Sequence, residues 1–245
     1  MPHFLISSNT VNKDQISIID KELYNHIVKA LRIKKDEKLL LIDENEIQYI
    51  VNVEDISKSE IHTKVIEKYK SNRKLYHNIN LAQSVLKPDA QFSTIQKATE
   101  LGIKTIIPLI TDNCTVKQSI INEKISKWQK IAIESVKQCE RADIPQIKSS
   151  TTLTKLLNSK EYDIVVAFVE KYSTSSLKNF LKSKIDLSKK SILAIIGPEG
   201  GFSEKEFGEL KEHNIPMVSL GNLIYRADTA ATVAIANIIY GLDNE

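Results

Sequence analysis

The sequence is poor in cysteine and contains no long apolar run. Cys114 and Cys139 are the only cysteines, and their spacing suits neither a metal site nor a disulfide framework. We expect Cys139, at an apolar helical position, to be a buried reduced thiol. No apolar run reaches membrane-spanning length, and the N-terminal MPHFLISSNT lacks the basic region and apolar core of a signal peptide. The sequence therefore predicts a cytoplasmic protein with no membrane contact and no metal.

The chain also lacks a strong charge of either sign. Lys and Arg total 34 and Asp and Glu total 31, which gives a formal net charge of +3. An ordinary protein has such a balance, so any affinity for nucleic acid must come from local patches of basic residues.

Two common nucleotide-binding motifs are absent. No G-x-G-x-x-G follows the first strand of an α/β pattern, and no GK[ST] occurs. Residues 78–104 contain only Gly102, so the early glycine-rich loop of open-sheet methyltransferases is missing as well. These absences argue against a dinucleotide-binding fold, a P-loop fold and the common methyltransferase fold.

Patterning divides the chain into two parts. Residues 1–70 contain short strand candidates at 39–42, 46–53 and 61–69, and a helix at 21–31 whose Leu23, Ile27, Ala30 and Leu31 should pack inward. This pattern suits a small β-barrel, and the charged stretch 68–74 predicts a linker. We therefore expect a first domain at residues 1–72 and a second at 73–245.

The second part alternates strands with helices, which predicts an α/β domain with a parallel sheet. The expected strands are 79–85, 105–110, 164–168, 192–196 and 217–220, and the clearest helix is 122–141. Leu101-Gly102 has the pattern of a helix C-terminus with glycine in the C′ position. Residues 229–240 are apolar nearly all round, so they predict a buried helix.

Glycine is scarce, yet Gly197, Gly200 and Gly201 fall within five residues. They follow a continuous apolar run, 192–196, and precede the capping box of Ser203 and Glu206. Glycine permits positive φ and close approach of a ligand to the backbone. The sequence predicts a rigid strand–loop–helix turn, with its amides and helix N-terminus open to a polar small molecule. A purely structural turn would not also require Gly221 after the next strand.

Several motifs carry a family resemblance over nearly the whole chain. They are the pairing of IGPEGGFSEKE at 196–206 with LGNLIYRADTAA at 220–231, HIVKALR at 26–32, QKATELG at 96–102 and QCERADIP at 138–145. Together they resemble the SPOUT methyltransferases, and more narrowly the ribosomal RNA small subunit methyltransferase E family. The sequence departs from the family pattern where Leu223 replaces Arg and Asp228 replaces Glu.

The resemblance implies a knotted SPOUT α/β domain after a PUA-like, RNA-binding β-barrel. It also implies a homodimer with residues 229–240 in the interface, S-adenosyl-L-methionine as cofactor, and 16S ribosomal RNA of the small subunit as substrate, methylated at N3 of one uridine. The residues expected to bind the cofactor are Phe168, Glu170, Gly197, Pro198, Glu199, Gly200, Gly201, Leu220, Gly221, Asn222, Tyr225, Thr229 and Ala230. The expected catalytic residue is Arg226, whose guanidinium could stabilise charge on the uracil or grip a phosphate.

Basic residues give a candidate RNA-binding surface. The predicted contacts are His26, Lys29, Arg32, Lys35 and Arg141. Simpler structural interpretations stay open: a solvated helix face for the first four, an ion pair with Glu134 or Glu140 for Arg141, and one with Asp228 for Arg226. Glu170 could equally be a solvated carboxylate, and Glu199 could orient the loop. Two other functions also stay open, ribose 2′-O methylation of RNA and non-catalytic RNA binding in ribosome assembly.

Overall fold

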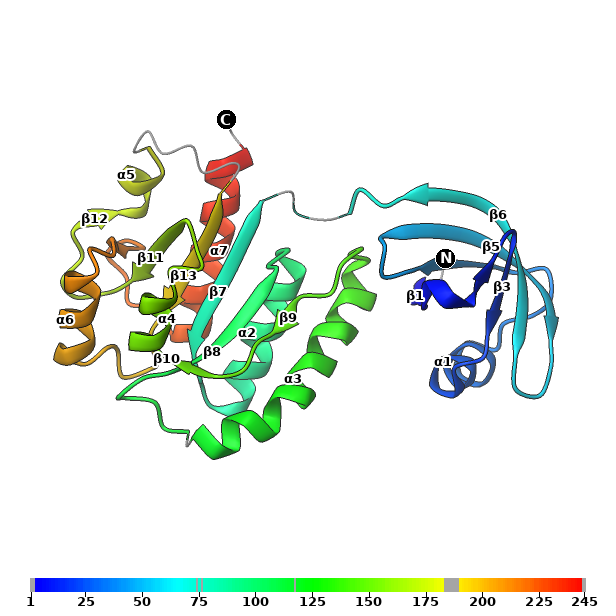
Figure 1. Cartoon of the computed structure of the whole chain (residues 1–245), viewed down its shortest axis with the longest axis horizontal. Helices are drawn as coiled ribbons and strands as arrows, with labels where there is room; N and C mark the ends of the chain where they lie inside the picture. The colour runs from blue at the N-terminus through cyan, green and yellow to red at the C-terminus, as the bar shows by residue number, and fades with distance from the viewer. Residues whose placement is uncertain (1–2, 74, 76, 117, 183–189, 244–245) are drawn as a thin grey trace. The chain divides into compact units, whose positions relative to one another are not determined.

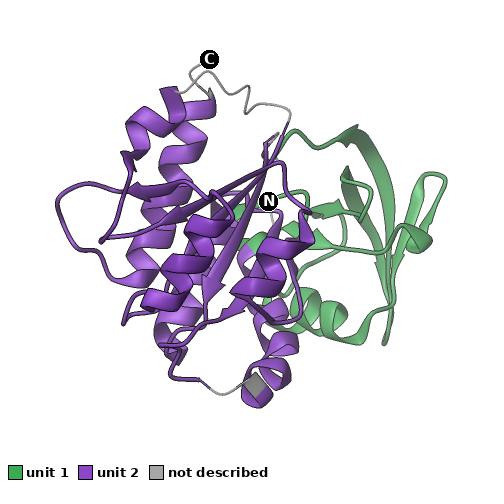
Figure 2. Ribbon diagram, turned by 60° about the vertical axis from the view of Figure 1, so that its left-hand side comes forward, with its two compact units in different colours: residues 1–74, 136–143 green, residues 75–135, 144–245 purple. Residues whose placement is uncertain are grey.

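The computed structural model describes residues 3–73, 75, 77–116, 118–182 and 190–243 (Figure 1). The chain splits into two compact units (Figure 2). Unit 1 comprises Met1–Lys74 and Val136–Asp143, and unit 2 comprises Leu75–Ser135 and Ile144–Glu245. A boundary at residue 72 stays a prediction. Among the described residues, no helix is long and apolar enough to cross a membrane.

Unit 1 is built on a six-stranded sheet in the order β1-β4-β5-β6-β3-β2. Neighbouring strands are antiparallel except for β1 and β4, which are parallel. The bounds are β1 His3–Leu5, β2 Val11–Asn12, β3 Gln15–Ile18, β4 Lys38–Ile42, β5 Ile47–Ile56 and β6 Ile61–Lys70. The predicted strands are therefore confirmed, but β6 continues to Lys70, so the first part of the expected linker is strand.

The predicted helix at 21–31 changes type halfway. It consists of α1 (Lys21–Asn25) and the π-helical η2 (His26–Ala30), after the short η1 (Ser8–Thr10). Asp20 caps α1 by accepting a 2.8 Å hydrogen bond from the Leu23 N–H. The wider π turn shifts the residues that follow it around the axis. Ile27 is fully buried as expected, whereas Ala30 and Leu31 are exposed, so their predicted inward packing is wrong.

Unit 2 contains an eight-stranded sheet in which every pairing is parallel. The order is β10-β8-β7-β13-β11-β14-β12, with β9 also paired to β8. The bounds are β7 Asn78–Ser84, β8 Thr105–Ile110, β9 Gln146–Ile147, β10 Thr151–Thr152, β11 Ile164–Phe168, β12 Ser175–Ser176, β13 Ser191–Ile196 and β14 Met217–Ser219. The predicted parallel α/β sheet is confirmed.

Helices cover both faces of this sheet, so its strands are buried on both sides. Alternate residues of β13 enter different cores: Ile192, Ala194 and Ile196 face one, and Leu193 and Ile195 the other. The first core also takes residues from α2 (Pro88–Glu100), α3 (Gln118–Cys139), α5 (Leu177–Lys182) and α7 (Ala227–Asp243). The second takes residues from α4 (Leu153–Ser159) and α6 (Glu204–Glu212).

The helices of unit 2 and their ends test four further expectations. Gly102 follows α2 with φ of +91°, and Ser203 caps α6 through the predicted capping box, so both are confirmed. Residues 229–240, expected to form a buried helix, lie in α7, where Tyr240 is 71% exposed and Asn237 is exposed, so the chain itself buries only one face. Cys139 forms no disulfide, as expected, but it is only half-buried.

Candidate functional site

The strands of unit 2 bring several loops to one edge of the sheet. Ile196, at the end of β13, is the register partner of both Phe168 on β11 and Gln83 on β7. Phe168 in turn pairs with Val218 on β14. Because these parallel strands end at the same level, the segments that follow them emerge side by side. Ligands in α/β sheets bind outside such carboxyl ends.

Two of the site's glycines have backbone conformations that favour glycine. Gly201 has φ of +72° and Gly221 has φ of +125°. A Cβ built at either position would meet no atom within 4 Å, so both border open space. Gly200 does not have a positive φ, and a Cβ there would lie 3.2 Å from the Asn113 Cβ. At Gly200 the lack of a side chain therefore makes room for Asn113.

Two side chains, from β7 and from the segment after β8, and one backbone N–H after β7 hold the 197–201 loop. Asn113 Nδ2 donates to the Gly201 carbonyl at 2.9 Å, and Gln83 Nε2 donates to the Gly197 carbonyl at 3.2 Å. The Lys87 N–H donates to Glu199 Oε1 at 3.4 Å. This last contact agrees with the interpretation of Glu199 as a residue that orients the loop.

Gln83 also carries an unused acceptor. Its side chain is 1% exposed, and its Oε1 has no hydrogen-bond partner among the described residues. Leaving a buried acceptor unpaired costs about 1–3 kcal/mol. An N–H or O–H donor on a bound molecule would remove that cost.

The N-terminus of α6 is occupied by its own residues. Glu206 is 4% exposed, and its carboxylate accepts from the Ser203 N–H at 2.9 Å and the Asp112 N–H at 3.0 Å. Ser203 Oγ donates to Asp112 Oδ2 at 2.6 Å. Burial raises the pKa of Glu206 above its ordinary value. The expected open helix N-terminus is thus partly closed, and the capping box fixes the end of the glycine loop.

The predicted residues after β11 and β13 differ in accessibility. Phe168 is 5% exposed and belongs to the core, so only its backbone could reach a ligand, and Pro198 is buried. Glu170 and Gly200 are exposed, and Gly197 is half-buried. Of the predicted residues, Glu170 alone lies in the segment directly after β11, and its exposed side chain can contact a ligand.

The loop after β14 is open to solvent. Gly221 and Asn222 are exposed, and Leu223 and Ile224 are 72% and 79% exposed. Ser219 shapes the turn, because its Oγ donates to the Gly221 carbonyl at 2.9 Å and accepts from the Gly221 N–H at 3.1 Å. The other predicted residues here are all half-buried: Leu220, Tyr225, Thr229 and Ala230.

Arg226 stands between this loop and α7. Its side chain is exposed, and among the described residues its guanidinium forms no ion pair. The alternative in which Asp228 pairs with it is therefore not observed. Its carbonyl accepts from the Ala230 N–H at 2.8 Å, so its backbone starts the helix while its charge stays free.

The predicted RNA-binding residues separate into two groups. His26, Lys29, Arg32 and Lys35 are exposed on unit 1, and the His26 ring packs edge-on against Phe4. Arg141 is instead buried, with its side chain 6% exposed. Its NH2 group donates to Asp143 Oδ2 at 2.8 Å. Glu140, one of the two predicted partners, pairs with Arg73 instead, and the burial of Arg141 disfavours direct contact with phosphate.

Sequence reasoning missed the residues that support the glycine loop. Gln83, Asp112 and Asn113 lie more than eighty residues before the loop that they contact. The available signal was positional: parallel strands place their carboxyl ends together, so polar residues after the first two strands belong near the loop. Among the described residues, no group of three or more His, Cys, Asp or Glu could hold a metal ion.

Comparisons with known proteins place these features in a family. Residues 73–239 match the model of an RNA methyltransferase domain, and residues 19–66 match that of an RNA methyltransferase PUA domain. The crystal structure of a ribosomal RNA small subunit methyltransferase E from Neisseria gonorrhoeae, bound to S-adenosyl methionine, has a similar fold. Its TM-score is 0.84 with 24% identity, over 97% of this chain and 96% of that one.

Relatives similar in sequence carry the same name. The ribosomal RNA small subunit methyltransferase E of Buchnera aphidicola (subsp. Acyrthosiphon pisum, strain APS) is 33% identical, over 91% of this chain and 87% of the relative. That of Bacillus subtilis (strain 168) is 30% identical, over 91% of this chain and 89% of the relative. The chain therefore belongs to the RNA methyltransferase family that contains the ribosomal RNA small subunit methyltransferases E.

Proposed function

We propose that the protein methylates N3 of one uridine in 16S ribosomal RNA, with S-adenosyl-L-methionine as methyl donor. The observation that carries this proposal is that adjacent parallel strands end at the same level, so that two glycine loops follow them, the second leading to an exposed arginine, Arg226, which forms no ion pair with any described residue. The relatives' names supply the substrate class, and the uridine N3 position comes from the family resemblance.

The residues at the strand ends fit this cofactor. Open space at Gly201 and Gly221 lets a ligand approach the backbone. Gln83 Oε1, which has no hydrogen-bond partner in the described chain, is an acceptor for a ligand N–H or O–H. The remaining predicted contacts would act through the backbone at Phe168, Gly197, Pro198 and Leu220, and through side chains at Glu170, Asn222, Tyr225 and Thr229. The sulfonium of the cofactor supplies an already activated methyl group.

Arg226 is the proposed catalytic residue. The N3 position of uracil must lose a proton, and the developing negative charge spreads over the neighbouring carbonyl oxygens. An exposed guanidinium without an ion-pair partner in the described chain can donate to such an oxygen, or hold a phosphate that fixes the nucleotide. Alignment of donor and acceptor then provides the rest of the rate enhancement.

Unit 1 is proposed to dock RNA. It contains the match to an RNA methyltransferase PUA domain and carries the exposed residues His26, Lys29, Arg32 and Lys35. In this proposal residues 1–72 are the RNA-binding domain, residues 73–245 the knotted methyltransferase domain, and the protein acts in the cytoplasm.

We also propose a homodimer through α7, because Tyr240 and the preceding Leu223 and Ile224 leave apolar side chains exposed.

One experiment separates the candidate activities. The protein is incubated with methyl-labelled S-adenosyl-L-methionine and small ribosomal subunits from cells that lack it, and the digested RNA is analysed by nucleoside mass. Label in 3-methyluridine supports the proposal. Label in a ribose-methylated nucleoside would assign 2′-O methylation, and bound subunits without label would leave a non-catalytic binding protein.

A further inference from the structure

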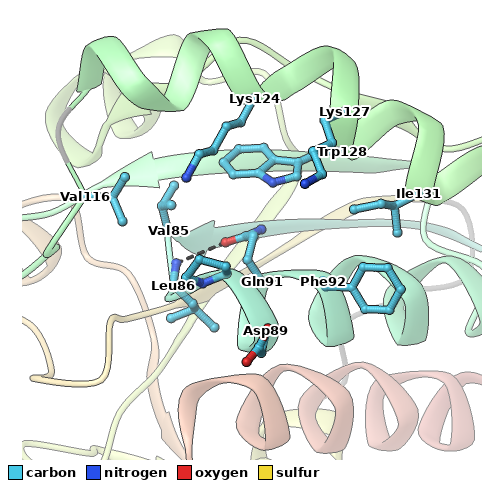
Figure 3. A pocket seen from close by; sticks show the side chains of 11 residues that line it. Val85, Leu86, Asp89, Gln91, Phe92, Val116, Lys124, Lys127, Trp128 and Ile131 are labelled. Carbon is cyan, nitrogen blue, oxygen red and sulfur yellow. Dashed lines mark hydrogen bonds between the residues drawn. The ribbon is translucent and has the colours of Figure 1, made fainter.

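A cavity that plays no part in the proposed cofactor site lies between α2 and α3 of unit 2 (Figure 3). Its volume is about 200 Å³, which is below the roughly 300–1,000 Å³ of pockets for drug-sized ligands. It therefore suits one planar ring rather than a large molecule. None of the residues of the 197–201 or 220–225 loops lines it.

The cavity combines aromatic rings with positive charge. Trp128 is 6% exposed and turns its indole into the space, while Phe92 on α2 is 50% exposed (Figure 3). Lys124 and Lys127 reach down from α3 on either side of the indole (Figure 3). Neither lysine forms an ion pair with any described residue, and Asp89 is the one carboxylate in the lining.

The cavity also offers a placed hydrogen-bond donor. Gln91 is 2% exposed, and its Oε1 accepts from the Leu86 N–H at 3.0 Å. With the oxygen fixed in this way, the amide nitrogen points toward α3 (Figure 3). A uracil carbonyl oxygen is an acceptor that such an amide nitrogen can satisfy.

The position of the cavity connects it to the proposed reaction. Val85 and Leu86 directly follow β7, so the cavity opens at the same edge of the sheet as the glycine loops. The next residue, Lys87, donates its N–H to Glu199 of the 197–201 loop. A nucleotide in the cavity would thus lie next to the segment that the 197–201 loop contacts.

We propose that this cavity binds one unpaired nucleotide of the RNA substrate, with its base against Phe92 and Trp128 and its phosphates beside Lys124 and Lys127. The inference rests on the proposed function, since it names the RNA subsite of that reaction. Single-stranded nucleic acid is bound by this combination of aromatic rings and a basic groove. The two lysines, which form no ion pair within the described part of the chain, also complement a polyanion better than an uncharged apolar partner.

Trp128 gives a direct test, because it is the only tryptophan in the chain. Its fluorescence is followed while a short single-stranded oligouridylate is titrated into the full-length protein, and binding is measured in parallel by anisotropy of labelled RNA. We expect saturable quenching that follows the binding curve. RNA that binds without any change in Trp128 emission would overturn the proposal.

Variants then identify the contacts. Phe92→Ala removes an exposed ring and should raise the Kd for the oligouridylate about fivefold or more, as loss of one stacked base does. Phe92→Tyr keeps the ring and should restore binding. Lys124→Ala with Lys127→Ala should weaken binding and lower the salt slope by about 0.7 per lost phosphate contact. Lys130→Ala is the matched control, because Lys130 is exposed on α3 but does not line the cavity.

The outcomes separate this inference from the proposed function. Normal quenching in a protein that transfers no methyl group would keep the subsite and refute the reaction. Methylation of small subunits with unchanged KM in the Phe92→Ala and lysine variants would refute the subsite and keep the reaction. Loss of the dimer in the Phe92→Ala variant, with no response of Trp128 to RNA, would show that a second copy of the chain covers the cavity.

Discussion

Replacement of Gly221 by alanine tests whether the loop after β14 needs glycine for its backbone rather than for ligand contact alone. Three glycines give a matched set, because a Cβ at Gly201, Gly208 or Gly221 meets no atom within 4 Å. They differ in φ, which is +72° at Gly201, +125° at Gly221 and not positive at Gly208, inside α6. Steric crowding in the unliganded protein is therefore the same for all three substitutions, and φ is the variable.

The expected free energies follow from these angles. Gly208→Ala should raise the free energy of unfolding by about 0.5–1 kcal/mol, because alanine is the better helix former. Gly201→Ala should cost about 1–2 kcal/mol, the penalty of a left-handed conformation. The left-handed region is centred near a φ of about +57°, and Gly221 lies further from it than Gly201 does. Gly221→Ala should therefore cost about 1–3 kcal/mol. The loop is exposed and can relax, so part of this strain appears as weaker cofactor binding.

Urea unfolding measures the part of the strain that lowers the free energy of unfolding, and calorimetry with S-adenosyl-L-methionine measures the part that weakens cofactor binding. We expect Gly221→Ala to raise the Kd about tenfold for each 1.4 kcal/mol that does not appear in the unfolding free energy. Gly208→Ala should leave the Kd unchanged. A Gly221→Ala protein with the stability and cofactor affinity of the wild type would refute the argument, because the strain would then appear nowhere.

Three further predictions concern Arg226, the basic surface and the dimer. Arg226→Ala should retain cofactor affinity and lose about 10²–10³ in methyl transfer, and turnover equal to wild type on small subunits would exclude a role in the reaction. Reversing the charge at Lys29, Arg32 and Lys35 should reduce RNA affinity and lower its salt slope by about 0.7–0.9 per lost phosphate contact, whereas an unchanged slope would place the RNA elsewhere. The wild type should sediment as a dimer at micromolar concentration and Tyr240→Asp should shift it toward monomer, so a monomeric wild type would contradict the proposed interface.

Strands β8, β11 and β13 of unit 2 could be predicted closely because they are largely apolar runs, whereas the two-residue strands β9, β10 and β12 are mostly polar and were not predicted. Because both faces of such a strand are buried, its apolar composition alone is enough to identify it. The predicted strands at 105–110 and 164–168 have the same bounds as β8 and β11. The helix at 21–31 was harder to predict. Its apolar spacing fits a regular α-helix, and the single π turn that exposes Leu31 leaves no mark in that spacing.

The site was only partly predictable for a related reason. Glycine and a capping box are local signals, so the 197–201 loop and the start of α6 could be located from the sequence. Which glycine has positive φ depends on the whole turn, and Gly201 rather than Gly200 has it. The contact of Asn113 with the Gly201 carbonyl joins residues 88 apart, and no local pattern encodes it.

The two halves of the proposed site differ in how much they depend on side chains. The cofactor half is shaped by backbone conformation, and its supports, Gln83 and Asn113, act by holding carbonyl oxygens in place. The side chains of Leu223 and Ile224 are exposed to solvent, so the departure from the family pattern at Leu223 leaves the glycine backbone unchanged. The RNA half instead depends on charge, on Arg226 and on the lysines of α3. Substitutions at Leu223 or Ile224 should therefore change RNA recognition or assembly more than cofactor affinity, and substitutions at Gly221 should do the reverse.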